Sequence, residues 1–382
     1  MVYNKLLRDC KEFLWTRKYV KGEFKKIKKD SYQNIVKLYP LSKDQKQDID
    51  EFYLSNLGEK IPYDWHRYYA AHSGSFTPQY FPDLLLRPFF EHFMNYEVHY
   101  ALVFEDKNIL PYIAKAANVK VPNRIISKTH GIIRDKDNNV ITESEAVHLL
   151  ADYGDVFCKP TKNTYGGRGC FKSSFEKGVD IKSNNNIRQI LDVLGEEYVI
   201  QDVLKCHYSI ASLYPKAVNT FRVITYRWKS EFICMPVFMR IGQGGSVVDN
   251  GAAGGMFVGV KADGTLTDKA VMPYNTCILT HPDTGVAFKG HKIEGFTKVV
   301  DSALKMHRMI PEIGLVYWDF TINENTEPVL IECNIIKGTI YAIEMTHGIS
   351  PFGERTAEVV QWIRKMRNTP VAKRKNYAFG NL

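Results

Sequence analysis

Long hydrophobic runs and paired cysteines are both missing from this sequence. None of the uncharged apolar runs in its 382 residues approaches the roughly 18 residues that a membrane-spanning helix needs. The first residues, MVYNKLLRDCKEFLW, lack the apolar segment and the small-residue cleavage site of a signal peptide. The seven cysteines show no C-x-x-C pairing, which is typical of reduced thiols rather than of a disulfide framework. We therefore expect a cytoplasmic protein.

Charge is abundant and biased toward positive. Lys and Arg number 51 against 42 Asp and Glu, and residues 1–50 alone hold 13 basic against 7 acidic residues. Such a balance suits an anionic partner, but zinc-finger spacing, an RNP-like aromatic pattern and an arginine-rich arm are all missing, so we expect no nucleic-acid binding. Two interpretations stay open for the basic front end. It is either a lysine-rich surface in contact with solvent or a peripheral contact with the cytoplasmic face of a membrane.

Hydrophobic spacing divides the chain into a helical front and a mixed remainder. Helices are predicted at 3–30, 44–56 and 83–104, with an aromatic, irregular stretch, YDWHRYYAAHSGSFTPQYFPD, between the last two. Further on, the pattern predicts a helix at 108–118, a strand after Pro122, helices at 143–151, 184–194 and 293–309, and strands at 155–159, 169–173, 198–203, 220–228, 231–241, 256–260, 314–322 and 328–334. Strands that mix with helices and pair as hairpins predict an α+β fold rather than a doubly wound sheet.

Residues 318–334, WDFTINENTEPVLIECN, predict a hairpin with oxygen-bearing side chains on one face. If the hairpin closes symmetrically about Asn325–Thr326, Asp319 lies opposite Glu332, and Asn334 follows two residues along the same face. A slip of one residue would separate them. Oxygen ligands suit Mg²⁺, which completes its coordination with phosphate oxygens and water. A hairpin whose polar face is merely hydrated is the alternative.

A lysine and a glycine loop follow in VFCKPTKNTYGGRGC, residues 156–170. A strand ends at Lys159, and Gly166, Gly167 and Gly169 precede the next strand, so backbone N–H groups there can approach anionic oxygens. The order of residues in a Walker A loop is absent. A flexible turn would have the same composition.

The stretch YVIQDVLKCH, residues 198–207, predicts a strand that runs into an extended crossing between two domains. The backbone N–H and C=O groups of such a linker can meet the edge of an adenine ring. An edge strand without a special role is the alternative.

In this order, these stretches resemble the ATP-grasp superfamily over roughly residues 105–350. Asp106–Lys107 ahead of VKVP matches the family's first lysine, Lys159 the second, Gln201 to Leu204 the adenine hinge, and Asp319 with the E-x-N of Glu332 and Asn334 the magnesium ligands. The segments AVNTFRVITY and FMRIGQGGSVVDNGAAGGMFVGV are most similar to the sugar-transfer-associated branch. The hinge departs from many ligases, which have Glu where this chain has Gln201. Tyr317 stands where some amino-acid ligases carry Arg.

The resemblance implies two α+β subdomains that clamp ATP, with a helical unit at 1–104, a linker helix and lid at 105–200, and a large subdomain at 201–382. It also implies roles for individual residues: nucleotide binding by Lys107, Lys159, Gly166, Gly167, Gly169, Gln201, Asp202, Leu204 and His207; Mg²⁺ binding by Asp319, Glu332 and Asn334; catalysis by Arg222 and Arg240; and substrate binding by Asn250, Gly254 and Gly255. An ordinary ion pair within a strand is the alternative for either arginine.

The activity that the resemblance implies is an ATP- and Mg²⁺-dependent ligation of a carboxylate to an amine through an acyl phosphate, in cell-surface polysaccharide biosynthesis. The partners would be a small-molecule or glycan-linked carboxylate and an amine acceptor. A phosphotransferase acting on a sugar or another alcohol, and a non-catalytic ATP-binding component of a glycan-assembly complex, are the alternatives. For Glu344, His347 and the aromatic stretch, packing is favoured over contact with substrate.

Overall fold

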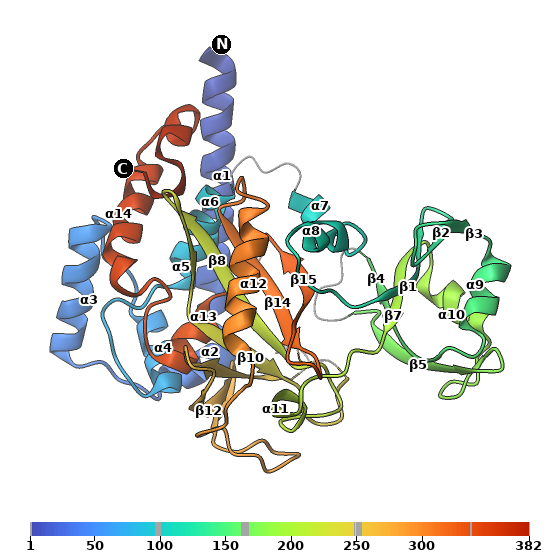
Figure 1. The fold of residues 1–382 in the computed structure, drawn as a ribbon. Coiled ribbons are helices and arrows are strands. Elements are labelled where there is room, and N and C mark those ends of the chain that lie inside the picture. Colours follow the sequence, from blue (N-terminus) through green and yellow to red (C-terminus); the bar gives the residue numbers. More distant parts are fainter. Residues whose placement is uncertain are drawn as a thin grey trace.

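The computed structural model describes residues 2–95, 101–161, 168–247, 249, 254–336 and 338–381. It contains a helical front unit, a small sheet and a large sheet (Figure 1). None of the helices in these ranges combines the length and the apolar composition that crossing a membrane requires. The arrangement of helices and sheets is α+β, as predicted from the strand and helix pattern.

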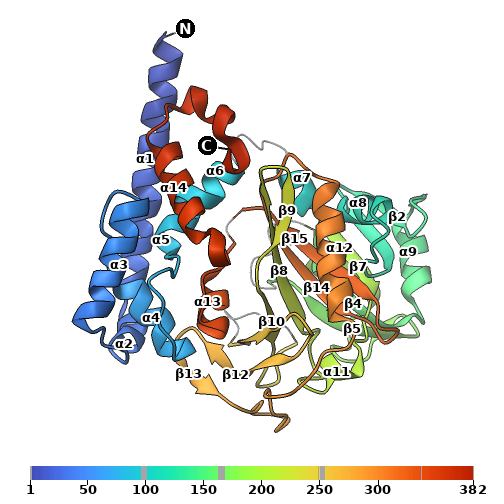
Figure 2. The ribbon, with the colours of Figure 1, turned by 60° about the vertical axis from the view of Figure 1, so that its left-hand side comes forward.

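The front unit begins with a long helix that projects from the body of the molecule (Figures 1 and 2). Its elements are α1 (Val2–Ile27), α2 (Asp30–Val36), α3 (Lys43–Asn56), α4 (Asp64–Ser73), α5 (Asp83–Leu85), the π-helix η1 (Leu86–Glu91) and α6 (His92–Met94). The single helix predicted at 83–104 is wrong, because α5, η1 and α6 replace its first part and α7 (Ala101–Glu105) its last. Pro88 lies within η1 and has no N–H to donate, which disfavours a regular α-helix there.

The aromatic stretch after α3 is not irregular, as the sequence pattern suggested, because much of it forms α4. Trp65, Tyr68, Tyr69 and His72 recur at helical spacing and are buried. They belong to or contact a core that also contains Tyr226 and other residues of the large sheet. The aromatic side chains therefore pack the front unit onto the large sheet, as favoured above.

The small sheet forms a separate body beside the large one (Figure 1). Its antiparallel strands lie in the order β3-β2-β1-β7-β4-β5-β6. The strands and the two helices that cover them are β1 (Arg124–Thr129), β2 (Ile132–Asp135), β3 (Val140–Ile141), α9 (Glu143–Leu150), β4 (Gly154–Pro160), β5 (Phe171–Glu176), β6 (Val179–Asp180), α10 (Ile187–Leu194) and β7 (Glu197–Asp202). This sheet, called the lid below, has its own hydrophobic core, drawn from residues 125–200. The preceding helix α8 (Leu110–Ala116) packs in the core of the large sheet instead.

The large sheet runs β13-β12-β11-β10-β8-β14-β15, and β9 pairs with β8. Its elements are α11 (Tyr208–Ala211), β8 (Thr220–Trp228), β9 (Glu231–Cys234), β10 (Val237–Ile241), β11 (Met256–Val260), β12 (Leu266–Met272), β13 (Asn275–Ile278), α12 (Phe296–Arg308), β14 (Leu315–Ile322), β15 (Pro328–Asn334), α13 (Tyr341–His347), η4 (Gly353–Arg355), α14 (Thr356–Arg367) and η5 (Val371–Gly380). The predicted strand 231–241 is divided at Pro236, which cannot donate a ladder hydrogen bond.

The two faces of the large sheet meet different partners, which Figure 2 shows in side view. Along β14, Val316, Trp318 and Phe320 pack with α12, while Leu315 and Tyr317 face the core shared with the front unit. This alternation is expected for a strand that is buried on both faces. Asp319 has the parity of Tyr317, so its carboxylate lies on the face of the sheet that also receives the front unit.

Candidate active site

The hairpin of β14 and β15 brings Asp319 and Glu332 directly opposite each other, as predicted. Tyr317 pairs with Asn334 in the same register, but Phe320 pairs with Leu330, so the register shifts by one between Asp319 and Phe320. This bulge leaves Ile331 unpaired and lets Leu330 face the core while Glu332, two residues later, faces the opposite side. A strand with a buried apolar face can therefore also present a carboxylate to a cleft.

Asp319 is buried and held by two arginines. Arg222 donates from Nε to Oδ1 at 2.7 Å and from Nη2 to Oδ2 at 3.3 Å, and Arg240 Nη2 lies 2.9 Å from Oδ2. Burial of a carboxylate without positive partners would be costly, so the two guanidinium groups account for its place in the interior. Both arginines therefore form ion pairs, as the alternative interpretation of the sequence expects.

Arg240 lies in a second network that the sequence motifs did not point to. Its Nε and Nη2 donate to Thr220 Oγ1 at 3.0 and 2.7 Å, and Nε lies 3.6 Å from Asp249 Oδ2. The same Asp249 oxygen accepts from the Thr220 N–H at 3.0 Å and from its hydroxyl. Burial raises the pKa of Asp249, and the Arg240 guanidinium opposes that rise. Asp249 and Thr220 thereby fix the direction of the Arg240 side chain.

Two lysines approach the same hairpin from the lid side. Lys107 Nζ donates to Glu332 Oε1 at 3.1 Å. Lys159, at the end of β4, is only 4% exposed. Burial and then repulsion from Lys107 lower the pKa of Lys159 to about 8. The Glu332 carboxylate opposes only part of this fall in pKa. A buried lysine with a lowered pKa is typical of a functional site that receives an anionic ligand.

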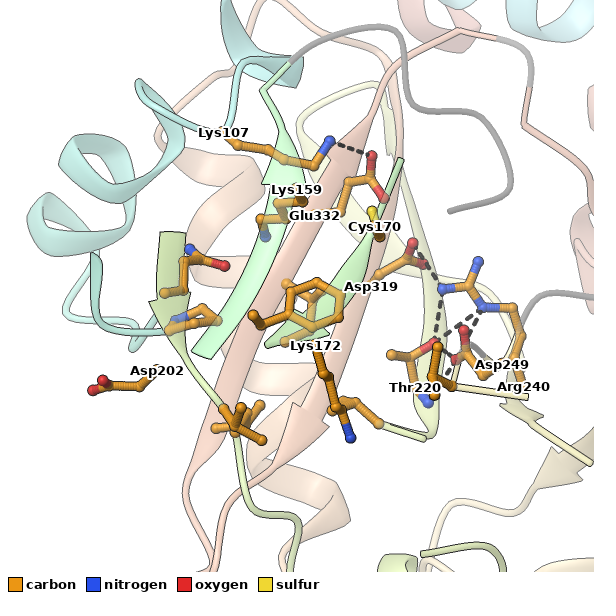
Figure 3. Close-up of a pocket in the computed structure, with 18 residues that line it drawn as sticks. Lys107, Lys159, Cys170, Lys172, Asp202, Thr220, Arg240, Asp249, Asp319 and Glu332 are labelled. Atoms are coloured by element: carbon orange, nitrogen blue, oxygen red, sulfur yellow. Dashed lines mark hydrogen bonds and ion pairs between the residues drawn. The ribbon is translucent and has the colours of Figure 1, made fainter. Parts of the chain in front are cut away.

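One cavity between the lid and the large sheet collects these residues (Figure 3). It is lined by Lys107, Pro122, Phe157, Lys159, Cys170, Lys172, Gln201, Asp202, Val203, Leu204, Val218, Thr220, Arg240, Val247, Asp249, Asp319, Ile331 and Glu332. Asp202 of the predicted hinge lies on one side of the cavity, and Asp319, Asp249 and Arg240 lie on the other (Figure 3). The lining also includes apolar side chains such as Phe157, Leu204 and Ile331. Such a cavity can receive a flat apolar ring against these side chains and a polyanion beside the charged groups.

The hinge residue Asp202 does not direct its side chain toward the charged groups on the opposite side of the cavity (Figure 3). Its carboxylate accepts from Asn123 Nδ2 at 3.0 Å and from the Tyr153 hydroxyl at 2.7 Å. The side chain therefore braces β7 against neighbouring lid segments. Its predicted nucleotide contact would have to come from the backbone.

Other predicted residues lie outside the cavity lining. Arg222 donates a hydrogen bond to Asp319, which itself lines the cavity, and Asn334 lies on the same face of β15 as Glu332. His207 caps α11 through the Ser209 N–H instead of facing the cavity. The glycines at 169, 254 and 255 also fall outside the lining, although Gly169 has the positive φ of 74° that favours glycine. Gly166, Gly167 and Asn250 lie outside the described residues.

Three side chains from residues 91–105, at the end of the front unit and in α7, hold the end of β15. Glu105 accepts from the backbone N–H groups of Ile335 and Ile336 at 2.7 and 3.2 Å. Asn95 bonds the carbonyl groups of Leu315 and Ile335 and the N–H groups of residues 314 and 315. These contacts fix the strand directly after Asn334.

Glu91 completes this anchor. It accepts from the Tyr317 hydroxyl at 2.8 Å and from the Gly338 N–H at 3.1 Å. The backbone at Gly338 runs so close to the Tyr317 ring that a Cβ would lie 2.1 Å from it. No local sequence pattern marks Glu91, Asn95 or Glu105, because each acts on residues more than 200 positions away.

Glu344 and His347 belong to the packing of α13. Glu344 is fully buried and accepts from the Phe81 N–H at 2.5 Å, while His347 Nε2 lies 2.8 Å from the Val237 carbonyl oxygen. Packing is therefore the better interpretation for both, as the sequence favoured.

The donor set at the hairpin fits Mg²⁺. Asp319 and Glu332 face each other across the ladder, and Asn334 makes no side-chain hydrogen bond within the described part of the chain. Two carboxylates and an amide oxygen are hard ligands of the kind Mg²⁺ takes, with phosphate oxygens and water for the remaining positions. Among the described residues, no group of three or more His, Cys, Asp or Glu side chains is gathered as a metal site on its own. This finding agrees with a metal ion whose coordination shell is completed by the oxygens of a bound phosphate.

The family of the chain follows from its sequence. The model of the family described as "Sugar-transfer associated ATP-grasp" matches residues 87–358, well over half of the chain. The protein belongs to this family, and its two sheets with the cavity between them form an ATP-grasp fold. None of the curated proteins matches the sequence significantly.

Solved structures that resemble this chain do so at low identity and with TM-scores below 0.5. They include the D-Ala:D-Ser ligase VanG from Enterococcus faecalis (TM-score 0.40, 13% identity, covering 69% of this chain and 62% of that one). Another is an L-amino acid ligase from Bacillus licheniformis (TM-score 0.37, 10% identity, 68% and 48% covered). A third is the N5-carboxyaminoimidazole synthetase from Staphylococcus aureus complexed with ADP (TM-score 0.37, 13% identity, 62% and 46% covered). The chain spans less than two thirds of each of these proteins.

Proposed function

We propose that the protein is an ATP- and Mg²⁺-dependent ligase that joins a carboxylate to an amine through an acyl phosphate. One observation carries the proposal above the others: Lys107 and Lys159 from the lid side meet Asp319, Glu332 and Arg240 from the large sheet around a single cavity. Membership of the ATP-grasp family supports nucleotide binding there. The family's description is the basis for proposing that the substrates belong to cell-surface polysaccharide synthesis or modification.

Adenine would lie against the apolar side chains of the cavity, between Phe157 and Ile331 and beside the backbone of the hinge. The phosphates would extend toward Lys159 and Lys107, whose positive charges are already in place. Because Lys159 is buried, its attraction for a phosphate is not weakened by water. Asp319, Glu332 and Asn334 would hold Mg²⁺, whose positive charge would offset the negative charge of the phosphates.

In the first step an oxygen of the substrate carboxylate attacks the γ-phosphorus and ADP leaves, which gives the acyl phosphate. Arg222 and Arg240, on the wall beside Asp319, would bind the oxygens of the transferred phosphoryl group. In the second step the amine attacks the acyl carbon, phosphate leaves, and the nitrogen loses a proton to form the amide. Closure of the lid over the cavity would exclude water, which otherwise hydrolyses the acyl phosphate.

The test is a phosphate-release screen over amino acids, uronic acids and amino sugars. The proposal requires ADP and phosphate release that depends on Mg²⁺, on an acid and on an amine together. Asp319→Ala and Glu332→Ala should abolish it. The matched control is Glu327→Ala, which removes a carboxylate from the exposed turn of the same hairpin.

The outcome also separates the alternatives. A phosphorylated sugar or alcohol formed without an amine would identify a phosphotransferase. Nucleotide binding without turnover, whichever acceptors are added, would identify a non-catalytic component. Release that is insensitive to both alanine variants would remove the hairpin from the mechanism altogether.

A further inference from the structure

The outer face of α1 carries a regular stripe of lysines and leucines. Leu7, Lys11, Leu14, Lys18, Lys21 and Lys25 form this α1 stripe. They recur at alternating intervals of four and three residues, so they lie on one face of the helix. All six are exposed, and the leucines are 41% and 63% exposed. The N-terminal end of α1 projects beyond the rest of the molecule (Figures 1 and 2).

The acidic residues of α1 are directed to the protein instead. Asp9 accepts from the Val371 N–H at 3.1 Å, Glu12 is paired with His92 at 2.8 Å and with Arg374, and Glu23 lies 3.6 Å from Lys26. Among residues 7–28, whose side chains are described, none of the exposed residues is therefore an Asp or a Glu. Positive charge and exposed apolar groups are segregated together on the outer face.

The neighbouring C-terminal segment adds to this positive surface. Residues 359–382 contain no Asp or Glu, and η5, which contacts α1, presents Lys373 and Lys375 to solvent. Phe13, next to the stripe, is 63% exposed. Large apolar side chains that stand exposed among lysines on a projecting helix are typical of a surface that meets a partner.

We propose that the α1 stripe is a peripheral docking surface for a bilayer that contains anionic phospholipids. The lysines would meet the headgroups, and Leu7 and Leu14 would enter the interface between headgroups and acyl chains. The exposed leucines favour a bilayer over nucleic acid. The phosphate backbone of nucleic acid attracts positive charge but gives aliphatic side chains no apolar surface to bury against. A second copy of the chain is disfavoured, because two stripes packed face to face would oppose their lysines. The inference does not depend on which reaction the cavity performs.

The experiment is vesicle flotation of the full chain at low and high salt. The probes are vesicles of phosphatidylcholine mixed with phosphatidylglycerol, and vesicles of phosphatidylcholine alone. We expect binding to the mixed vesicles at low salt, little to the neutral ones, and loss at high salt. The stripe variant reverses its four lysines: Lys11→Glu, Lys18→Glu, Lys21→Glu and Lys25→Glu. Since each lysine near an anionic surface strengthens binding about fivefold, affinity should fall at least several hundredfold.

A control with the same change of net charge reverses four exposed lysines away from α1. These are Lys136→Glu, Lys177→Glu, Lys261→Glu and Lys289→Glu. The control should bind vesicles within a few-fold of the wild-type chain. A second variant, L7S with L14S, keeps every charge and should still lower the affinity for the mixed vesicles. This result would show that the leucines insert into the bilayer and that charge attraction alone does not account for binding. Unfolding temperature and ADP binding should be the same in all variants, because none of these residues lies at the cavity or in a core.

Several results would overturn the proposal. One is that the wild-type chain fails to float with the mixed vesicles. Another is that the control loses binding as completely as the stripe variant. Binding to duplex DNA that depends on the stripe, in the absence of vesicle binding, would assign the surface to nucleic acid. A concentration-dependent dimer that L7S with L14S abolishes would assign it to a second copy of the chain.

Discussion

The low pKa of Lys159 leads to a prediction about stability as well as about binding. Lys159 is buried at the end of β4, and Lys107 lines the same cavity. In the folded chain the ammonium group has lost most of its hydration and lies near the like charge of Lys107, and the Glu332 carboxylate offsets only part of this cost. Replacing it in Lys159→Met keeps the volume of the side chain and removes the charge. We expect the variant to be more stable than the wild-type chain and to bind nucleotide more weakly.

The magnitude follows from the pKa. The lysine pKa falls from its ordinary 10.5 to about 8, and 10.5 − 8 = 2.5, which corresponds to roughly 3 kcal/mol. The unfolded chain binds the proton more tightly than the folded one, so this destabilisation is complete below about pH 8 and is relieved as the pH rises from about 8 to 10.5. The free energy of unfolding of Lys159→Met should therefore exceed that of the wild-type chain by about 3 kcal/mol near pH 7 and by about 1 kcal/mol near pH 9.5.

The assay is urea unfolding of both proteins across this pH range without nucleotide, beside ADP titrations at each pH. Wild-type affinity for ADP should fall as the pH rises through about 8, whereas the affinity of Lys159→Met should be low and nearly constant. Lys177→Met, at an exposed lid lysine, is the control and should change neither quantity. A variant that is less stable than the wild-type chain, or a stability difference that does not vary with pH, would refute the reasoning.

Three further predictions concern the hairpin and its anchor. Asp319→Asn removes the carboxylate that two part-buried guanidinium groups share, of which Arg240 keeps a second partner in Asp249, and should cost about 3 kcal/mol in urea unfolding; an unchanged unfolding free energy would contradict the ion-pair account. Glu105→Gln should cost about 1–2 kcal/mol and raise the Mg²⁺ concentration needed for half-maximal phosphate release, while ADP affinity without metal stays the same. Gly338→Ala should lower the unfolding temperature, because its Cβ meets the Tyr317 ring; Tyr317→Ala in the same chain should reverse the effect of adding the Cβ.

The fold was predictable where one physical signal dominates a segment. The strands and helices that were predicted in the lid and large sheet lie close to their predicted ranges, because hydrophobic period and turn residues are local signals. The strands β2, β3, β6, β12 and β13 and the helix α13 were not predicted. The aromatic residues of α4 were misjudged because Tyr and Trp favour strands and loops as readily as helices, and their packing on the large sheet decides the outcome. Pro236 predicts the break between β9 and β10, because proline cannot donate a ladder hydrogen bond, but the continuous apolar pattern of 231–241 favoured a single strand.

The candidate site was predictable to the extent that its residues stand in motifs. The predicted turn centre between Asn325 and Thr326 is wrong, because Ile322 pairs with Pro328 and the hairpin closes about Asn325. The predicted pair of Asp319 with Glu332 nevertheless forms, because the bulge at Ile331 shifts the register by one. That bulge depends on which side chains the core accepts and could not be predicted. Asp249 was missed although it stands inside a quoted motif, since nothing local indicates that it would orient Arg240. Glu105 acts across 230 residues of sequence, where periodicity and spacing give no information.

Charge balance in the cavity explains why nucleotide and metal should bind together. Asp319 is paired with two arginines, and Glu332 is paired with Lys107. A phosphate that draws Lys107 or an arginine toward itself leaves a carboxylate without its counter-charge, and that carboxylate then repels the phosphate. A divalent cation between the carboxylates and the phosphate oxygens would remove both penalties at once. ATP alone should consequently bind more weakly than ATP with Mg²⁺, and Glu332→Gln, which removes one of the two carboxylates, should narrow the difference.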